Sequence, residues 1–414
     1  MRILIQSFGS YGDVFPFIAL GRELNARGHE VLMFVNQRFE HITREAGLTF
    51  VQVGTADEYE RFLEDPHMWS ERRSLKHLLR VLAQHLPKAY KATIPHVLPG
   101  RTAVIGSTLA FSARLVQESL KVPGITVHLA PSIFRSVHRV PKLPGVIMPD
   151  WLPTFMKQGL YWLGDKYLVD PLIVGALNGF RAELQLPPVS RVFDRWIHAP
   201  ELVIGPFPQW YGDPQLDWPE QVRCTGFPLY DSVQDGVSPS LRNFIDAGSR
   251  PIVFTAGTAM KHGADFFQTT VAVCRQLERR GILLTSYPEQ VPQVLEADIH
   301  YAPYAPFSSL LPHCDALVHH GGIGTTSQAL KAGIPQLIRP CAYDQFDNAD
   351  RIVSLGVGRV LTRSEYQIDR VCETLRDLLM NPTVHAFCRS VSERFENRNP
   401  VIETCDLIED YVLR

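Results

Sequence analysis

The segment 319–326, His-His-Gly-Gly-Ile-Gly-Thr-Thr, holds the densest set of groups that could bind an anion. An apolar run at 316–319 leads into it, and a helical pattern follows it. Glycines at such a strand-to-helix turn let the backbone approach a ligand, and the amides of a helix N-terminus attract phosphate. The plain alternative is a tight turn that needs glycine for a positive φ. Imidazole, hydroxyls and glycines at one helix start favour a phosphate site.

Asp344 and Gln345 form a second polar group, just after an apolar run at 335–338. Ligands of parallel sheets collect at the carboxyl ends of the strands, where this pair is expected to lie. Carboxylate and amide groups suit the vicinal hydroxyls of a sugar. Alone, such a pair is more often a helix cap or a solvated loop. Next to the glycine-rich segment, it predicts sugar recognition.

Asp13 is the candidate for acid–base chemistry. It ends the loop Gly9-Ser-Tyr-Gly-Asp13, which connects a strand to a helix. A carboxylate there could act as general base on a hydroxyl. An aspartate near a helix start is equally typical of a cap that the macrodipole stabilises. The residues alone leave both roles open.

These loops lie within one repeating pattern of strand, glycine-bearing loop, helix and strand. The first half predicts strands at 2–6, 31–35, 104–106 and 124–127, with helices at 15–27 and 112–120. The second half predicts strands at 251–255, 282–285, 316–319 and 335–338, with a helix at 266–280. Strands that alternate with helices form parallel sheets. The sequence therefore predicts an α/β fold with two Rossmann-like domains.

Five prolines between Pro206 and Pro228 place the boundary of the halves within 205–238, because proline is disfavoured inside strands and helices. We expect an N-terminal domain over 1–215, a linker over 216–238 and a C-terminal domain over 239–395. The residues 396–414 are expected to form a helix that returns to the N-terminal domain.

Charge and cysteine content exclude some classes of protein. Lys and Arg number 41 and Asp and Glu 43, so the net charge is −2 and lacks the basic excess of a nucleic-acid-binding protein. The seven cysteines include no Cys-x-x-Cys pair, which is typical of free thiols in a reducing compartment. No uncharged run reaches the about 18 residues of a spanning helix. We expect a cytoplasmic protein and leave peripheral association with the inner membrane face open.

Several motifs are absent. The chain has no Asp-x-Asp, no phosphate-binding loop ending in Gly-Lys-Ser/Thr, no Gly-x-Ser-x-Gly, and no dinucleotide fingerprint after its first strand. A diphosphate would then be held by helix amides, hydroxyls and imidazole. We expect no metal ion and no bound cofactor.

Three segments together resemble the signatures of family-1 nucleotide-sugar glycosyltransferases of the GT-B type, in the bacterial branch that includes antibiotic and sterol glycosyltransferases. They are Gly9-x-x-Gly12-Asp13-Val14-x-Pro16, His320-Gly-Gly-x-Gly-Thr325 and Asp344-Gln345-x-x-Asn348-Ala349. The resemblance covers nearly the whole chain and is strongest to a rhamnosyltransferase of glycolipid synthesis. It implies two Rossmann-like domains facing across a cleft, with the acceptor on the first and the donor on the second.

The resemblance also implies roles for individual residues. Asp13 would be the general base, and Asp344 and Gln345 would bind the hydroxyls of the donor sugar. Tyr304 would lie against the nucleotide base, with the Ala305 backbone at the base edge. The donor diphosphate would be bound by His320, Gly322, Gly324, Thr325 and Thr258, with Thr326 assisting.

Two positions depart from the family pattern. Phe307 replaces a glutamine of the base-binding loop, and Gln328 stands where many UDP-sugar enzymes carry a ribose-binding glutamate. An amide accepts hydrogen bonds from two ribose hydroxyls less well than a carboxylate. This favours a dTDP-sugar and leaves UDP open.

The predicted reaction is inverting, metal-independent transfer of a rhamnose- or glucose-type hexose from a dTDP- or UDP-sugar to a hydroxyl of a hydrophobic small-molecule or lipid acceptor. Segments 69–98, 134–167 and 193–218 are rich in Trp, Phe, Leu and Pro and would line the acceptor pocket, although core packing explains single aromatics equally well. The alternatives are a UDP-glucosyltransferase of a small aromatic natural product, a catalytically idle nucleotide-sugar-binding helper, and a nucleotide-sugar epimerase.

Overall fold

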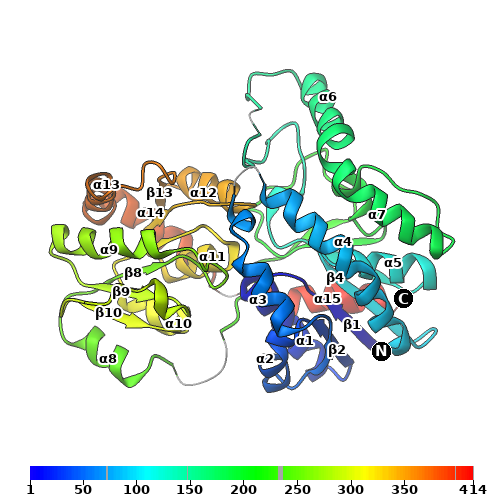
Figure 1. The fold of residues 1–414 in the computed structure, drawn as a ribbon, viewed down its shortest axis with the longest axis horizontal. Coiled ribbons are helices and arrows are strands. Elements are labelled where there is room, and N and C mark those ends of the chain that lie inside the picture. The colour runs from blue at the N-terminus through cyan, green and yellow to red at the C-terminus, as the bar shows by residue number, and fades with distance from the viewer. Residues whose placement is uncertain (71–72, 147, 232–235, 397, 414) are drawn as a thin grey trace. The chain divides into compact units, whose positions relative to one another are not determined.

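The computed structural model describes residues 1–414 except 71–72, 147, 232–235, 397 and 414. The chain folds into two compact units. The N-terminal unit comprises Met1–Met68, Arg72–Tyr230 and Asn399–Arg414, and the C-terminal unit comprises Trp69–Glu71 and Asp231–Arg398. Both are α/β units built on a parallel sheet (Figure 1), as the alternation of strands and helices predicts.

The described residues of the N-terminal unit form a seven-stranded parallel sheet in the order β3-β2-β1-β4-β5-β6-β7. Its central strands are short apolar runs that are buried on both faces, as crossover helices require. The strands are β1 (Arg2–Gln6), β2 (Glu30–Val35), β3 (Thr49–Gln52), β4 (Thr102–Ser107), β5 (Gly124–Val127), β6 (Leu202–Gly205) and β7 (Val222–Cys224). The helices are α1 (Tyr11–Ala26), α2 (Glu40–Glu45), α3 (Ala56–Glu64), α4 (Ser74–Thr93), α5 (Phe111–Leu120), α6 (Thr154–Gly164), α7 (Asp170–Glu183) and α15 (Pro400–Val412).

The structure differs from the sequence analysis at the predicted linker over 216–238. Strand β7 lies within that range and pairs with β6, so the N-terminal unit continues to Tyr230. This strand has three residues and follows Pro219, which made it indistinguishable from a loop in the sequence. It lies at the edge of the sheet, where prolines and short strands are tolerated.

The C-terminal helix α15 belongs to the N-terminal unit and packs against α1. Arg27, at the end of α1, contacts Glu409 at 2.6 Å and Asp406 at 2.7 Å on α15. The His29 ring lies 2.8 Å from the second carboxylate oxygen of Glu409. These contacts hold helix α15 against the C-terminal end of helix α1 (Figure 1).

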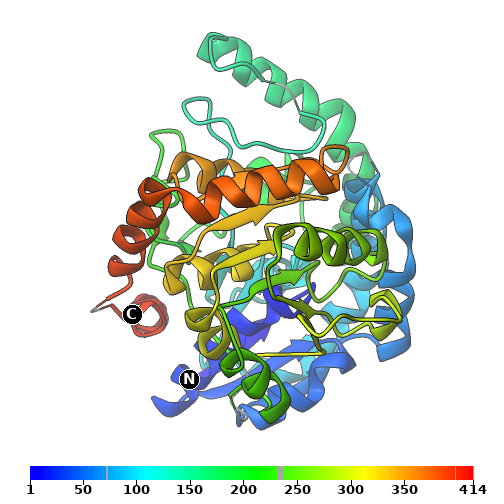
Figure 2. The same ribbon diagram turned by 90° about the vertical axis from the view of Figure 1, so that its left-hand side faces the viewer.

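The described residues of the C-terminal unit form a six-stranded parallel sheet in the order β10-β9-β8-β11-β12-β13. Helix α9 packs against α13, and α11 packs against α14 (Figure 2). The strands are β8 (Ile252–Thr255), β9 (Gly281–Leu284), β10 (Ile299–Ala302), β11 (Ala316–His319), β12 (Gln336–Ile338) and β13 (Gly358–Val360). The helices are α8 (Pro239–Asp246), α9 (Ala264–Leu277), α10 (Phe307–Leu310), α11 (Ile323–Ala332), α12 (Gln345–Ser354), α13 (Ile368–Met380) and α14 (Pro382–Glu393).

Among the described residues, no helix is both long enough and apolar enough to cross a bilayer.

Candidate functional site

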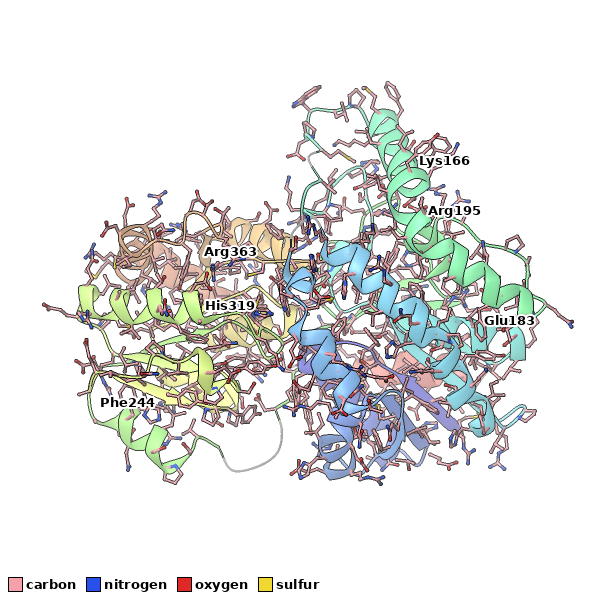
Figure 3. The ribbon with its side chains drawn as sticks, in the orientation of Figure 1. Lys166, Glu183, Arg195, Phe244, His319 and Arg363 are labelled. Carbon is pink, nitrogen blue, oxygen red and sulfur yellow. The ribbon has the colours of Figure 1, made fainter. Side chains whose placement is uncertain are left out.

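The turn between β11 and α11 holds the predicted phosphate-binding residues. Gly322 is the N-cap of α11, and no side chain caps this helix, so its first amides are available to a ligand. Gly321 has φ +93°, and a Cβ there would lie 2.8 Å from Ile338. His319 is fully buried and accepts a hydrogen bond from the Gly321 amide at 3.1 Å (Figure 3). His319 therefore shapes the turn, while the residues after it can face a ligand.

His320 occupies a space that two glycines leave open. A Cβ on Gly257 would lie 2.6 Å from the imidazole, and one on Gly322 would lie 2.5 Å from it. Burial lowers the pKa of His320 to about 4, so the ring is neutral at pH 7. Its Nδ1 is buried and has no hydrogen-bond partner in the part of the chain that the structure describes. A neutral imidazole next to uncapped helix amides forms a suitable donor site for a diphosphate.

The predicted hydroxyl donors differ in their accessibility. Thr258 is exposed in the loop after β8, which is the sheet neighbour of β11. Thr325 and Gly324 are partly buried in the first turn of α11. Thr326 is fully buried, and its hydroxyl, like Nδ1 of His320, has no hydrogen-bond partner among the described residues. Thr258 and Thr325 are therefore the more accessible of the predicted hydroxyls.

Asp344 and Gln345 begin α12, and their environments differ. The buried Gln345 uses its Oε1 to accept hydrogen bonds from the amides of Cys341 at 2.8 Å and Ala342 at 3.0 Å. Asp344 is partly buried, and its Oδ2 accepts a hydrogen bond from Asn348 at 2.8 Å. Asn348 also donates to the Gly321 carbonyl at 2.9 Å, so it joins this loop to the phosphate turn. Gln345 thus holds the loop, and Asp344 is its more accessible polar group.

The candidate base- and ribose-binding residues contain a carboxylate that sequence reasoning missed. Tyr304 is 45% exposed, whereas Ala305 is buried. Gln328 donates a hydrogen bond to Asp231 at 3.4 Å, and Asp231 also accepts from the backbone amides of Phe307 and Ser308, both at 3.2 Å. Asp231 lies 97 residues from Gln328, and no local motif identifies it. A carboxylate from elsewhere in the chain therefore lies beside Gln328.

Asp13 acts as a helix cap in this structure and retains one oxygen for other interactions. Its Oδ2 accepts hydrogen bonds from the Ser10 amide at 2.6 Å and the Ser10 hydroxyl at 2.9 Å. Gly9 has φ +135°, and a Cβ there would lie 2.3 Å from this oxygen. Burial raises the pKa of Asp13, and the bonds from Ser10 partly offset that rise. Oδ1 has no partner among the described residues, so capping and proton acceptance are compatible.

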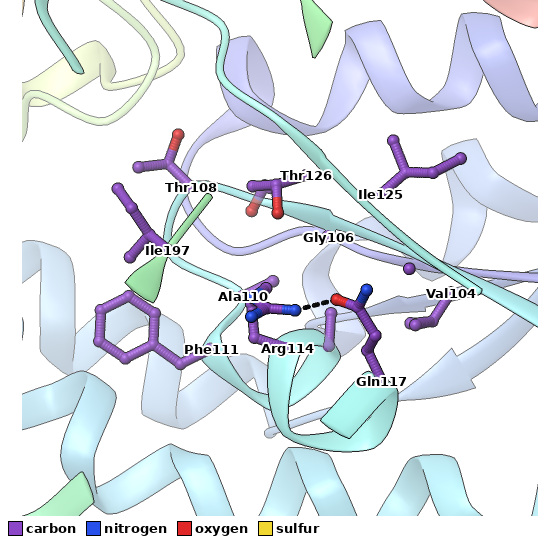
Figure 4. A pocket seen from close by; sticks show the side chains of 13 residues that line it. Val104, Gly106, Thr108, Ala110, Phe111, Arg114, Gln117, Ile125, Thr126 and Ile197 are labelled. Carbon is purple, nitrogen blue, oxygen red and sulfur yellow. Dashed lines mark hydrogen bonds between the residues drawn. The ribbon is translucent and has the colours of Figure 1, made fainter. Parts of the chain in front are cut away.

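A buried polar chain follows β4 and β5 in the N-terminal unit and was not found by sequence reasoning. The Thr108 hydroxyl lies 2.9 Å from Nδ1 of His128, and Nε2 of His128 lies 3.1 Å from Nδ1 of His198. Burial lowers the pKa of His198 to about 4 and that of His128 well below its usual value. Thr108 also lines a cavity of about 10 Å³ (Figure 4). This cavity has room for about one water molecule and not for an acceptor.

The aromatic segments that were expected to line an acceptor pocket divide into two groups. Trp196, Tyr211 and Trp218 are buried, and the Phe134 ring stacks on Trp218 at 4.6 Å, so these residues form core. By contrast, large apolar side chains between Trp151 and Leu168 are exposed. The sequence alone could not separate these groups because both have the same composition.

The two parallel-sheet units match the fold of GT-B glycosyltransferases, and the matches to known proteins identify the chain as a glycosyltransferase. Residues 3–139 match the glycosyltransferase family 28 N-terminal domain, and residues 282–403 match the erythromycin biosynthesis protein CIII-like C-terminal domain. These two matches, together with the similar proteins described below, support a nucleotide-sugar glycosyltransferase.

Similar proteins align over almost the whole chain. O-mycaminosyltylonolide 6-deoxyallosyltransferase of Streptomyces fradiae is 28% identical over 99% of this chain and 97% of that protein. A sterol 3-beta-glucosyltransferase of Arabidopsis thaliana is 26% identical over 98% of this chain and 67% of that protein.

Solved structures share the fold. The glycosyltransferase of kitacinnamycin has a TM-score of 0.76 at 19% identity and covers 99% of both chains. The spinosyn rhamnosyltransferase SpnG, solved with thymidine diphosphate, has a TM-score of 0.70 at 16% identity, over 99% of this chain and 100% of that chain.

Proposed function

We propose that this protein transfers a rhamnose- or glucose-type hexose from a dTDP- or UDP-sugar to a hydroxyl of an apolar acceptor, with inversion and without a metal ion or bound cofactor. The observation that carries the proposal is the neutral His320 beside the uncapped N-terminus of α11. Backbone amides and a neutral imidazole can stabilise the negative charge that develops on a leaving diphosphate.

In the proposed reaction, each polar group of the candidate site that a substrate can reach has one role. Asp13 takes the proton of the acceptor hydroxyl as that oxygen attacks the anomeric carbon, and the bond to the diphosphate breaks. The raised pKa of Asp13 makes it a stronger base than an ordinary carboxylate. Thr258 and Thr325 add hydrogen bonds to the diphosphate, and Asp344 accepts hydrogen bonds from the sugar hydroxyls.

Two observations bear on the donor nucleotide. SpnG and the glycosyltransferase VinC were solved with thymidine diphosphate, which supports a dTDP-sugar. Gln328 favours the same donor, but the carboxylate of Asp231 beside it could accept a hydrogen bond from a ribose hydroxyl. The Asp231 contact therefore keeps UDP as an alternative donor.

Similar proteins suggest the class of acceptor. By their names, the two relatives act on O-mycaminosyltylonolide and on a sterol, which supports a natural-product acceptor. Segments 12–18, 225–229, 304–306 and 340–349 resemble the rhamnosyltransferase of rhamnolipid synthesis, which supports a lipid-like acceptor. A UDP-glucosyltransferase of a small aromatic natural product is the second candidate function.

The decisive experiment is calorimetry and thermal shift of the purified protein with UDP, dTDP, GDP and their common sugars, with and without a chelator. A ligand that binds only the folded protein raises its melting temperature. We expect dTDP or UDP to bind equally well in chelator and to bind at least about tenfold more weakly to His320→Ala. Binding of none of these nucleotides, or equal binding to His320→Ala, would contradict the donor site.

A further inference from the structure

A continuous segment of the N-terminal unit exposes an unusual number of large apolar side chains. It comprises Trp151, helix α6 and the π-helical segment Asp165–Val169 that continues it. Trp151 is 80% exposed, Phe155 71% and Leu168 69%. We call the exposed set the α6 face: Trp151, Phe155, Met156, Leu160, Trp162, Leu163, Tyr167 and Leu168. Scattered exposed apolar residues are ordinary, but eight within 18 residues form a patch of the kind that marks a binding surface.

Helix α6 also extends away from the sheet of its own unit. Figures 1 and 2, which view the protein from perpendicular directions, both show α6 extending beyond the other helices of this unit. The buried Lys157 anchors the helix, since its ammonium donates to the carbonyls of Val137 and Asp150, both at 3.1 Å. The apolar side chains on the rest of the helix are therefore exposed while the helix itself is held in place.

The exposed charge of residues 151–169 is a single cation. Residues 151–169 are all described, and Lys166 is their single exposed charged side chain. Asp165 is buried and paired with Arg135 at 2.5 Å. The Lys166 ammonium lies 4.7 Å from the Trp162 ring centroid and 5.2 Å from that of Tyr167 (Figure 3). Lys166 thus places one cation beside the α6 face, and residues 151–169 have no exposed carboxylate.

We infer that the α6 face docks on a lipid bilayer that contains anionic lipids. Tryptophan and tyrosine favour the boundary between hydrocarbon and water, and a lysine whose stem lies along aromatic rings can reach a phosphate headgroup. An exposed carboxylate would be repelled by an anionic surface; the α6 face has none, and the exposed Asp150 lies just before it. At about 1.5 Å per residue, 16 residues from Thr154 to Val169 span about 24 Å, shorter than a bilayer core, so the helix lies in the interface.

The chemistry of the face favours a bilayer over a second copy of the chain. A face-to-face contact between the α6 faces of two copies would bring two Lys166 side chains to one apolar surface without an opposing carboxylate, which is unfavourable. Anionic lipid headgroups provide the complementary charge. Docking of the α6 face on a bilayer requires neither the donor nor the acceptor of the proposed reaction.

The test is co-sedimentation of the full chain with vesicles of phosphatidylcholine, with and without phosphatidylglycerol. The double variant Phe155→Gln with Leu168→Gln should lower the bound-to-free ratio at least about tenfold, because two apolar side chains no longer enter the interface. Lys166→Glu should lower binding only to the vesicles that contain phosphatidylglycerol. Leu216→Gln is the matched control, since Leu216 is 95% exposed in the same unit and lies outside the α6 face; its binding should be unchanged.

Two results would overturn the inference. One is wild-type protein that binds neither vesicle, or a double variant that binds as well as wild type. The other is a dimer, detected by light scattering without vesicles, that the double variant converts to a monomer; the α6 face would then be an interface between copies. Calorimetry with dTDP and UDP on each variant reports separately on the donor site, so failure of the proposed function is distinguishable.

Discussion

At the scale of single residues, Asp13 combines two roles that usually compete. One oxygen caps α1 through Ser10, and the other has no partner among the described residues. A substitution that removes both oxygens of Asp13 therefore removes a cap and a candidate base at once. Separating these effects requires a variant that weakens the cap and leaves the carboxylate in place.

We predict that Asp13→Asn lowers turnover about 10²–10⁴-fold and leaves nucleotide affinity nearly unchanged, because the amide cannot take the acceptor proton. The measurement is kcat with a transferable sugar, beside calorimetry with the nucleotide alone. Ser10→Ala is the control, since it removes one capping contact and keeps the carboxylate. Equal losses of turnover in the two variants would mean that Asp13 only caps the helix.

The contact between Asp231 and Gln328 leads to a second prediction at this scale. In Gln328→Glu, a new carboxylate would lie near the one that now accepts a hydrogen bond from Gln328 at 3.4 Å. Like charges at this distance repel, so we expect the variant to bind UDP more weakly, by about tenfold. Asp231→Asn combined with Gln328→Glu should recover that loss. Calorimetry with UDP and dTDP measures both effects, and tighter UDP binding by Gln328→Glu alone would refute this coupling.

At the scale of elements, the strand-to-helix turn after β11 depends on glycines that come from two strands. Gly257 follows β8, has φ +95° and lies against the His320 ring. The position of His320 is therefore set jointly by its own turn and by the neighbouring loop, so a change in one is transmitted to the other.

We predict that Gly257→Ala weakens nucleotide binding at least about tenfold, because the new Cβ displaces the imidazole and strains the backbone. Gly100→Ala is the matched control, since Gly100 has φ +70° and a methyl group there would have no neighbouring atom within 4 Å. Thermal unfolding of both variants separates strain from the loss of the site. Equal nucleotide affinity in Gly257→Ala and the wild type would show that the His320 position does not depend on this contact.

At the scale of the whole molecule, each unit contains a pair of neutral histidines, of which His128, His198 and His319 are buried and His320 is partly buried. Burial lowers the pKa of His319 to about 3 and of His320 and His198 to about 4, and lowers that of His128 well below its usual value. Unfolding restores these side chains to about 6.5, so the unfolded chain binds more protons between these values. Their contribution to stability is complete above pH 6.5 and is lost as the pH falls toward 4.

We therefore predict that the free energy of unfolding decreases between pH 7 and pH 5.5, by about 1.4 kcal/mol per pH unit for each proton taken up on unfolding. Urea unfolding at constant ionic strength measures this slope above the range in which ordinary carboxylates titrate. A stability that is constant or rises as the pH falls through this window would contradict the burial of these histidines in neutral form.

The sequence by itself determined the local units of this protein. Runs such as 2–6 and 316–319 predicted buried strands, because a short run of apolar residues is typical of a strand whose two faces are both covered by helices. Both parallel sheets follow from that alternation, and the glycine-rich turn at 320–326 follows from residue types within one loop. These features depend on residues that are adjacent in the chain, so they can be predicted from the sequence.

Only the tertiary structure decided which distant groups meet and which apolar residues stay exposed. Asp231 meets Gln328 across 97 residues, and His128 meets His198 across 70. Trp218 and Trp151 have the same side chain, yet one is core and the other is exposed. Composition records the hydrophobicity of a side chain, whereas burial depends on which surfaces the fold brings against it.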